Sequence, residues 1–203
     1  MLNSKIGVGT LVLILVSCSS KSINYLELNS FDENKQLQAV IEIPLGTNEK
    51  IEYNPLKNTF EQDTLDGQPR VIQFLSYPVN YGFIPSTTMT KNRQGDGDPL
   101  DVLVLGKPLK TGQVLTVKPI GLLLMKDNNE WDNKVLSIPI DKKFQTLSIE
   151  NFEDLSKNHS KIREMIGEWF KHYDKTAKIE ILGWSDENRA LEEIEKWQIS
   201  KSN

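Results

Sequence analysis

The stretch Val114-Leu-Thr-Val-Lys-Pro-Ile-Gly-Leu-Leu-Leu-Met125 decides the fold class of this 203-residue chain. It is long and largely apolar, and it contains Pro119 and Gly121. A proline removes one amide donor from a β-ladder and a glycine tolerates a sharp bend, so both residues are typical of bulges. We therefore expect one long strand that bends at a bulge, as in small β-barrels.

Shorter strand-like segments lie on both sides of this stretch. Residues 38–43 alternate partly between apolar and polar and stop at Pro44, and a turn rich in Gly and Asn leads to residues 50–53. This arrangement predicts a hairpin between the two segments. Three more strands are expected at residues 71–75, 102–105 and 135–140. The sequence has no repeat of fixed period, which argues against a propeller or a solenoid.

Helical patterns appear only near the end of the chain. Apolar residues recur at three- and four-residue spacing over residues 162–173, and Ser160 is placed to cap the start of that helix. A second helix is expected over residues 186–197, with Leu191, Ile194 and Trp197 on one face. Strands followed by helices predict an α+β, mainly β domain built on an antiparallel barrel.

Composition and charge narrow the class of protein. The chain has 38% apolar and 26% charged residues, a formal net charge of −4 and a pI near 5.3. It is long enough for one sizeable core but offers no basic surface for phosphate backbones, so we expect a single domain that does not bind nucleic acid.

The first residues resemble an export signal. Lys5 precedes an apolar run over residues 6–16, which is shorter than the ~20 residues of a membrane span. The run ends at Leu15-Val16-Ser17-Cys18, which resembles a bacterial lipobox and would place an acylated Cys18 in a membrane. An ordinary signal peptide with an incidental cysteine is the alternative. Cys18 is the only cysteine, so a disulfide within the monomer is excluded.

This reading divides the chain into three parts. Residues 1–17 are the expected signal peptide, residues 18–36 a lipidated polar spacer and residues 37–203 the folded domain. The expected location is the bacterial cell envelope, anchored by lipid to the membrane outside the cytoplasm.

Three aspartates gather at Asp96-Gly97-Asp98-Pro99-Leu100-Asp101, directly before an apolar strand. Carboxylates this close repel one another unless a cation neutralises them, which predicts a metal site. In an extended chain Asp96 and Asp98 would share one face. A solvated Asp-Gly turn is the alternative, and a calcium loop of the EF-hand type does not fit the spacing.

The remaining residue types indicate a hard metal ion. The two histidines, His159 and His172, lie on or beside the first predicted helix and are expected to be solvated. Oxygen ligands without imidazole or thiolate favour Mg²⁺, with Mn²⁺ as an alternative.

Other charged and phenolic groups extend the site. Asp127 and Asp132 flank a turn after the long apolar strand, and Lys134 follows them. Lys50 and Arg70 precede several tyrosines. Basic and phenolic groups bind phosphate and carboxylates bind cations, so the combination predicts a phosphate ligand bridged by metal ions.

At this point the chain resembles a known family, the soluble family I inorganic pyrophosphatases. Residues 96–102 fit the family signature Asp-x-Asp-Pro-hydrophobic-Asp-hydrophobic throughout, and the resemblance extends from Val40 to Trp184. It implies a five-stranded OB-like barrel with flanking C-terminal helices. It also implies Mg²⁺-dependent hydrolysis of pyrophosphate to two phosphates by metal-activated water, without a covalent intermediate.

The resemblance assigns roles residue by residue. The implied metal ligands are Asp96, Asp101, Asp132, Asp127 and Glu42. The implied phosphate ligands are Lys50, Arg70, Tyr81, Lys134 and Tyr173. Asp98 is the implied general base, and Glu52 and Tyr77 are expected to line the pocket.

Two features depart from the family pattern. Members commonly have Tyr-Lys where this chain has Tyr173-Asp174, so either Lys175 replaces the family lysine or this contact is lost. The spacing from Arg70 to Tyr77 is one residue shorter than usual. Family members form hexamers or dimers, so a homo-oligomer is an open alternative.

Two rival functions remain from the sequence. One is a non-catalytic envelope module that binds Ca²⁺ or a phosphorylated ligand. The other is a hydrolase whose main substrate is a different phosphoanhydride.

Overall fold

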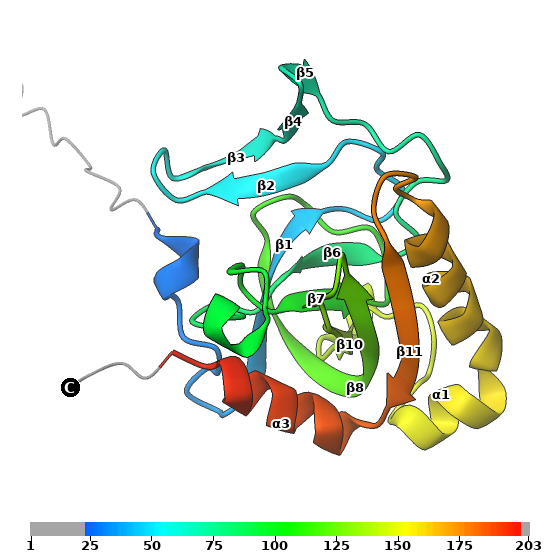
Figure 1. The fold of residues 1–203 in the computed structure, drawn as a ribbon. Helices are drawn as coiled ribbons and strands as arrows, with labels where there is room; N and C mark the ends of the chain where they lie inside the picture. The colour runs from blue at the N-terminus through cyan, green and yellow to red at the C-terminus, as the bar shows by residue number, and fades with distance from the viewer. Residues whose placement is uncertain (1–22, 200–203) are drawn as a thin grey trace, which may run out of the picture.

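The computed structural model describes residues 23–199, and five strands form the barrel at its centre (Figure 1). In the order of hydrogen bonding they are β1 (Leu37–Ile43), β6 (Asn80–Phe83), β7 (Asp101–Val104), β10 (Lys134–Pro139) and β8 (Val114–Asp127). Pairing of β8 with β1 closes the ring. The predicted α+β fold with an OB-like barrel is confirmed.

The long strand β8 bends as its sequence predicts. In its pairing with β10, Leu136 lies opposite Gly121 and Ser137 lies opposite Pro119, so Ile120 is the extra residue of a bulge. The bend lets one strand pair with β1 at its start, β10 in its middle and β11 (Ile179–Ser185) at its end. β8 therefore carries Asp127 from the barrel to the rim of the site.

One strand pair differs from the antiparallel expectation. β7 and β10 run parallel, with Lys134 opposite Asp101. The other pairs in the ring are antiparallel. Because both parallel strands begin at the same end of the barrel, a lysine and an aspartate far apart in sequence start side by side.

Two expected strand features are wrong. The segment β2 (Ile51–Asn54) pairs with β3 (Thr59–Gln62) rather than with β1, because the turn between β2 and β3 is short and contains Asn58 at a φ of 52°. Residues 71–75 form no strand beyond a bridge at Val71. The remaining short strands are β4 (Thr64–Leu65), β5 (Gln68–Pro69) and β9 (Glu130–Trp131).

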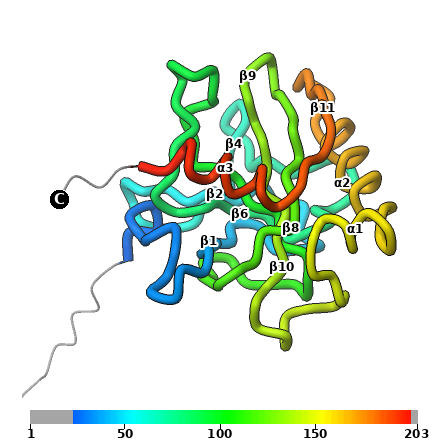
Figure 2. Tube along the Cα trace, turned by 90° about the horizontal axis from the view of Figure 1, so that it is seen from below, coloured from blue at the N-terminus to red at the C-terminus, as the bar shows by residue number. Residues whose placement is uncertain are grey.

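Three α-helices cover the barrel, α1 (Phe152–Asn158), α2 (Ser160–His172) and α3 (Glu187–Trp197). In Figures 1 and 2, α1 and α2 lie together at one side and α3 crosses another. The predicted Ser160 cap is wrong, because His159 is the N-cap residue and makes no side-chain cap bond. The other long helix, α3, does have a side-chain cap, because Asp186 accepts a hydrogen bond from the Arg189 amide.

The face that α3 buries is also shifted from the prediction. Leu191 is 39% exposed, whereas Ala190, Glu193, Ile194 and Trp197 are buried. None of the helices formed by residues 23–199 has the length and apolar character needed to cross a membrane. Short 3₁₀ turns occur at η1 (Tyr25–Glu27), η2 (Lys91–Arg93) and η3 (Lys142–Phe144).

The described part of the expected spacer packs on the domain. The Tyr25 ring contacts the rings of Tyr53 and Phe60, with centroids 5.2 and 5.0 Å away. The buried Ser30 hydroxyl donates to the Pro85 carbonyl at 2.7 Å. The part of the expected spacer that the structure describes therefore contacts the domain through Tyr25 and Ser30.

Candidate active site

A cavity of about 520 Å³ opens at one end of the barrel and gathers every residue that the sequence assigned to the site. These residues come from six strands, from the loops between them and from the C-terminal end of α2. They are Glu42, Lys50, Glu52, Arg70, Tyr77, Tyr81, Asp96, Asp98, Asp101, Asp127, Asp132, Lys134 and Tyr173.

A tight turn, not an extended chain, presents the first two aspartates. Gly97 has a φ of 98°, and the Asp98 amide donates to a carboxylate oxygen of Asp96 at 2.9 Å. The expected reason for their shared face, alternation along a strand, is thus wrong. Both side chains still line the cavity, because the left-handed glycine turns the chain back toward it.

Lys134 joins the two acidic segments at the floor of the cavity. Its ammonium nitrogen lies 2.5 Å from Asp101 and 2.8 Å from Asp132, and its side chain is 3% exposed. Burial alone lowers the pKa of Lys134, but the two carboxylates outweigh burial and raise it. The lysine therefore carries a fixed positive charge. Asp101 also accepts a hydrogen bond from the Tyr81 hydroxyl.

Five carboxylates that line the cavity hold their protons more tightly than usual, namely Glu42, Asp96, Asp98, Asp127 and Asp132. Burial, with mutual repulsion, raises the pKa of Asp96 to about 6 and that of Glu42 to about 8. The pKa values of Asp98, Asp127 and Asp132 are raised for the same reasons. Removing the protons from such a set leaves acids that repel one another, and a bound cation would relieve this repulsion.

The donor set fits a hard divalent cation. The buried Oδ1 atom of Asp127 has no hydrogen-bond partner, so it has a lone pair available in a polar hollow. The acidic groups that line the cavity are oxygen donors, as Mg²⁺ prefers. Within residues 23–199, no three acidic, thiol or imidazole groups already converge as a preformed ligand set. Asp101 and Asp132 contact Lys134 instead.

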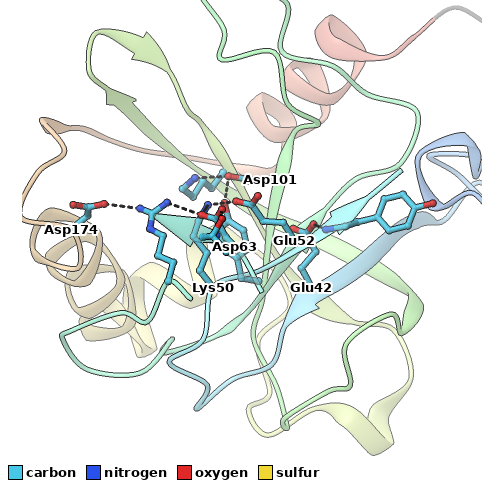
Figure 3. Close-up of polar contacts among 11 residues, drawn as sticks. Glu42, Lys50, Glu52, Asp63, Asp101 and Asp174 are labelled. Carbon is cyan, nitrogen blue, oxygen red and sulfur yellow. Dashed lines mark hydrogen bonds and ion pairs between the residues drawn. The ribbon is translucent and has the colours of Figure 1, made fainter. Parts of the chain in front are cut away.

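A second group of charges lies on the side of the cavity to which residues 50–70 contribute. Lys50 contacts Glu52 and lies 3.9 Å from Asp63. Arg70 lies 3.2 Å from Asp63 and 2.6 Å from Asp174, and Figure 3 shows these two acids on opposite sides of its guanidinium. Asp63 was not predicted, since an acidic residue at the end of an exposed hairpin has no distinguishing pattern.

Asp174, which stands where the family pattern has a lysine, binds Arg70 and Thr176. Its carboxylate accepts from Arg70, and it also accepts from the amide and hydroxyl of Thr176 at 2.9 and 2.6 Å. Burial alone raises the pKa of Asp174, but the Thr176 and Arg70 hydrogen bonds outweigh burial and lower it. Lys175 is absent from the described residues that line the cavity, whereas Arg70 is among them.

Aromatic rings form one wall of the cavity. The rings of Trp169 and Tyr173 stack with centroids 4.8 Å apart, and Trp169 lies 4.7 Å from Tyr77. Burial raises the pKa of Tyr173 to about 12, so its hydroxyl stays protonated and can donate to an anion. The sequence predicts Trp169 only as part of an apolar helix face, because no local pattern marks it as a residue that supports the site.

The histidines lie away from this chemistry. Neither belongs to the residues that line the cavity. The side chain of His172 is 61% exposed beside Glu168, as expected of a solvated helix position.

Comparisons with known proteins agree with this geometry. The family model described as inorganic pyrophosphatase matches residues 39–201. The inorganic pyrophosphatase of Saccharolobus solfataricus is 36% identical over 165 residues, covering 79% of this chain and 89% of that protein. That of Xylella fastidiosa is 36% identical over 175 residues, covering 81% and 90%.

Solved structures are similar over the same region. The inorganic pyrophosphatase structure from Thermus thermophilus has a TM-score of 0.71 and 33% identity, covering 85% of this chain and 95% of that chain. The structure from Neisseria gonorrhoeae has a TM-score of 0.69 and 30% identity, covering 84% and 94%.

Proposed function

Because the chain belongs to the inorganic pyrophosphatase family, we propose that its acidic cavity hydrolyses pyrophosphate to two phosphates with Asp98 as general base. The observation that carries this proposal is the placement of acids, bases and tyrosines around one cavity. A merely binding module would need the metal ligands and the cations but no further carboxylate beside them.

The proposed metal ligands are Asp96, Asp101, Asp132, Asp127 and Glu42. Divalent cations held there, most simply Mg²⁺ with Mn²⁺ as an alternative, would neutralise the phosphoryl oxygens and lower the pKa of an attacking water. The unpartnered Asp127 oxygen and the raised pKa values of the acids support this assignment.

The protein side chains then accept the proton of the water and bind the phosphate oxygens. The oxygen of the attacking water bonds to one phosphorus, and Asp98 accepts the proton that this water loses. The P–O–P bond breaks at the same phosphorus. Lys50, Arg70, Lys134, Tyr81 and Tyr173 donate to phosphate oxygens and stabilise the charge on the departing phosphate. Lys134 holds its proton throughout, because its pKa is raised by Asp101 and Asp132.

A phosphate-release assay tests this function. The purified protein with pyrophosphate and Mg²⁺ is expected to release two phosphates per substrate, and a chelator is expected to stop it. Asp98→Asn is expected to lower kcat on the order of 10²-fold, as loss of a general base does. Glu153→Gln, an exposed ion-pair residue on α1, is the matched control and should leave kcat unchanged.

The same assay separates the rival functions. Tight binding of Mg-pyrophosphate without turnover would favour the binding module. Faster release from triphosphate or nucleotides than from pyrophosphate would favour a different phosphoanhydride as substrate.

The location at the envelope rests on the sequence, since residues 1–22 lie outside the described residues. The apolar run and the Ser17-Cys18 junction support cleavage before Cys18 and acylation of its thiol and amino group. Intact-mass analysis of the protein from membranes should give the acylated chain from Cys18 to Asn203. A mass that includes Met1 without lipid would contradict it.

A further inference from the structure

A buried carboxylate lies behind the active site and takes no part in the chemistry described above. Glu193 is fully buried on α3. Its Oε1 accepts from Asn133 at 3.0 Å, from the Trp197 indole at 2.7 Å and from Lys196 at 3.1 Å. Its Oε2 lies 3.4 Å from Arg189. Glu193 is therefore a fully partnered charge that faces the barrel.

Asn133 connects this carboxylate to the site. It is 2% exposed, and its side-chain oxygen accepts from the Met125 amide on β8 at 3.1 Å. The Asp132 amide donates to the Met125 carbonyl at 3.1 Å. The turn that carries Asp132 is thus fixed to β8 by this backbone bond, by the Asn133 side chain and by the preceding β8–β9 pairing, and to α3 by Glu193.

Asn133 lies between Asp132 and Lys134 in the chain. The side chains of those two neighbours form an ion pair and line the cavity. Successive residues of an extended segment point to opposite faces, so Asn133 points away from the cavity and toward α3. A hydrogen bond to a charged acceptor is stronger than a neutral one, so the Glu193 carboxylate fixes the amide firmly.

We infer that Glu193 is a positioning residue that acts through Asn133 to hold Asp132 in the geometry for metal binding. This inference rests on the proposed function, which makes Asp132 a metal ligand. Groups that orient a ligand without touching the metal typically change metal affinity by about 10–100-fold when removed.

Three variants of the full chain test the role. Glu193→Ala and Asn133→Ala each remove the contact. Glu193→Gln keeps an oxygen acceptor for Asn133 and Trp197. Calorimetric titration with Mn²⁺ and Mg²⁺, without pyrophosphate, is the main measurement. The alanine variants are expected to bind metal at least about tenfold more weakly, and Glu193→Gln within about threefold of the unmodified protein.

Kinetics provide a second, independent readout. The Mg²⁺ concentration for half-maximal rate should rise in parallel with the dissociation constant, while kcat at saturating Mg²⁺ changes less than about threefold. A purely structural role would instead lower kcat through loss of folded protein and leave the metal affinity of the remaining fraction unchanged.

Matched controls use the other partners of the same carboxylate. Arg189→Ala and Lys196→Ala remove partners from the solvent side of Glu193 and leave Asn133 in place. They should keep normal metal affinity. The double variant of Glu193→Ala with Asn133→Ala should lose no more affinity than either single variant, because both act on one contact.

The result that would overturn the inference is a folded Asn133→Ala or Glu193→Ala protein with unchanged metal affinity. Equal weakening by Glu193→Gln and Glu193→Ala would also overturn it. If Glu193→Ala does not fold in a thermal melt, Asn133→Ala and Glu193→Gln decide the question. Failure of the proposed function is seen separately, as absence of phosphate release in the unmodified protein.

Discussion

The guanidinium of Arg70 lies 2.6 Å from the carboxylate of Asp174, a residue 104 positions later in the chain. Asp63 holds the same guanidinium at 3.2 Å. Two carboxylates on one arginine offset its positive charge and compete with phosphate for its donors. An acid, Asp174, thus restrains Arg70, the proposed phosphate ligand, at the position where the family resemblance implies a lysine.

The first prediction follows from this competition. Asp174→Asn should free Arg70 for phosphate, lower KM for Mg-pyrophosphate and strengthen inhibition by product phosphate. Loss of one partly exposed ion pair is worth up to about 1 kcal/mol, or roughly a fivefold effect. Steady-state kinetics with added phosphate measures both quantities. In an Arg70→Ala background the substitution should have no effect, and an unchanged KM in the single variant would contradict the prediction.

The second prediction concerns Lys134. Lys134→Met should leave Asp101 and Asp132 buried without their cationic partner, which costs about 3–5 kcal/mol of unfolding free energy without metal. Each kcal/mol lowers Tm by about 2–4 °C in a chain of this size. Mg²⁺ should restore more of Tm in this variant than in the unmodified protein, as measured by thermal melts. Lys157→Met, which breaks an exposed pair with Glu153, is the control and should shift Tm little.

The third prediction is a dependence of stability on pH in the absence of metal. The folded-state pKa is raised to about 6 for Asp96 and about 8 for Glu42, so the folded protein holds protons that the unfolded chain releases. The stability this provides is complete below pH ~4, the pKa of unfolded acids, and is lost as pH rises through 6 and 8. Tm should therefore fall over that range in chelator.

Two comparisons sharpen this test. Saturating Mg²⁺ should flatten the fall in Tm, since bound cations replace the protons. Glu42→Gln should make the fall shallower from pH ~4 up to 8, most clearly between pH 6 and 8, where Asp96 no longer contributes. A metal-free Tm that rises from pH 6 to 8 would rule out the raised pKa values.

The fourth prediction concerns the turn at Gly97. Gly97→Ala should cost about 1–2 kcal/mol, because its φ of 98° is strained for residues with a Cβ atom. It should also lower kcat by more than about tenfold, because Asp98 depends on this turn. Gly67→Ala is the control, since Gly67 has a φ of 75° and nothing near an added Cβ. It should lose stability without loss of kcat.

Local signals in the sequence were enough for part of the fold. Pro119 and Gly121 correctly predicted the bulge of β8, because each acts on its own backbone. The prediction of a hairpin between residues 38–43 and 50–53 was wrong, because strand pairing depends on distant partners. β1 pairs with β6 and β8 instead. The face of α3 was misjudged because the buried Glu193 is polar, and hydrophobic periodicity does not register it.

The site was predictable where residues carry a motif. All the assigned residues meet at one cavity, led by the Asp96 to Asp101 cluster. The partners that support them were not predictable. Asp63 and Asp174 reach Arg70 from separate segments, and Glu193 reaches Asn133 across 60 positions. No local pattern marks a contact that only the tertiary fold brings together.

The ammonium of Lys134 between Asp101 and Asp132 also bears on how the site binds a metal ion. On the proposal that Asp101 and Asp132 bind a divalent ion, the incoming ion must compete with the Lys134 ammonium for the same carboxylate oxygens. The lysine therefore sets part of the free-energy cost of metal binding, and it returns as the counterion of both acids whenever the ion leaves.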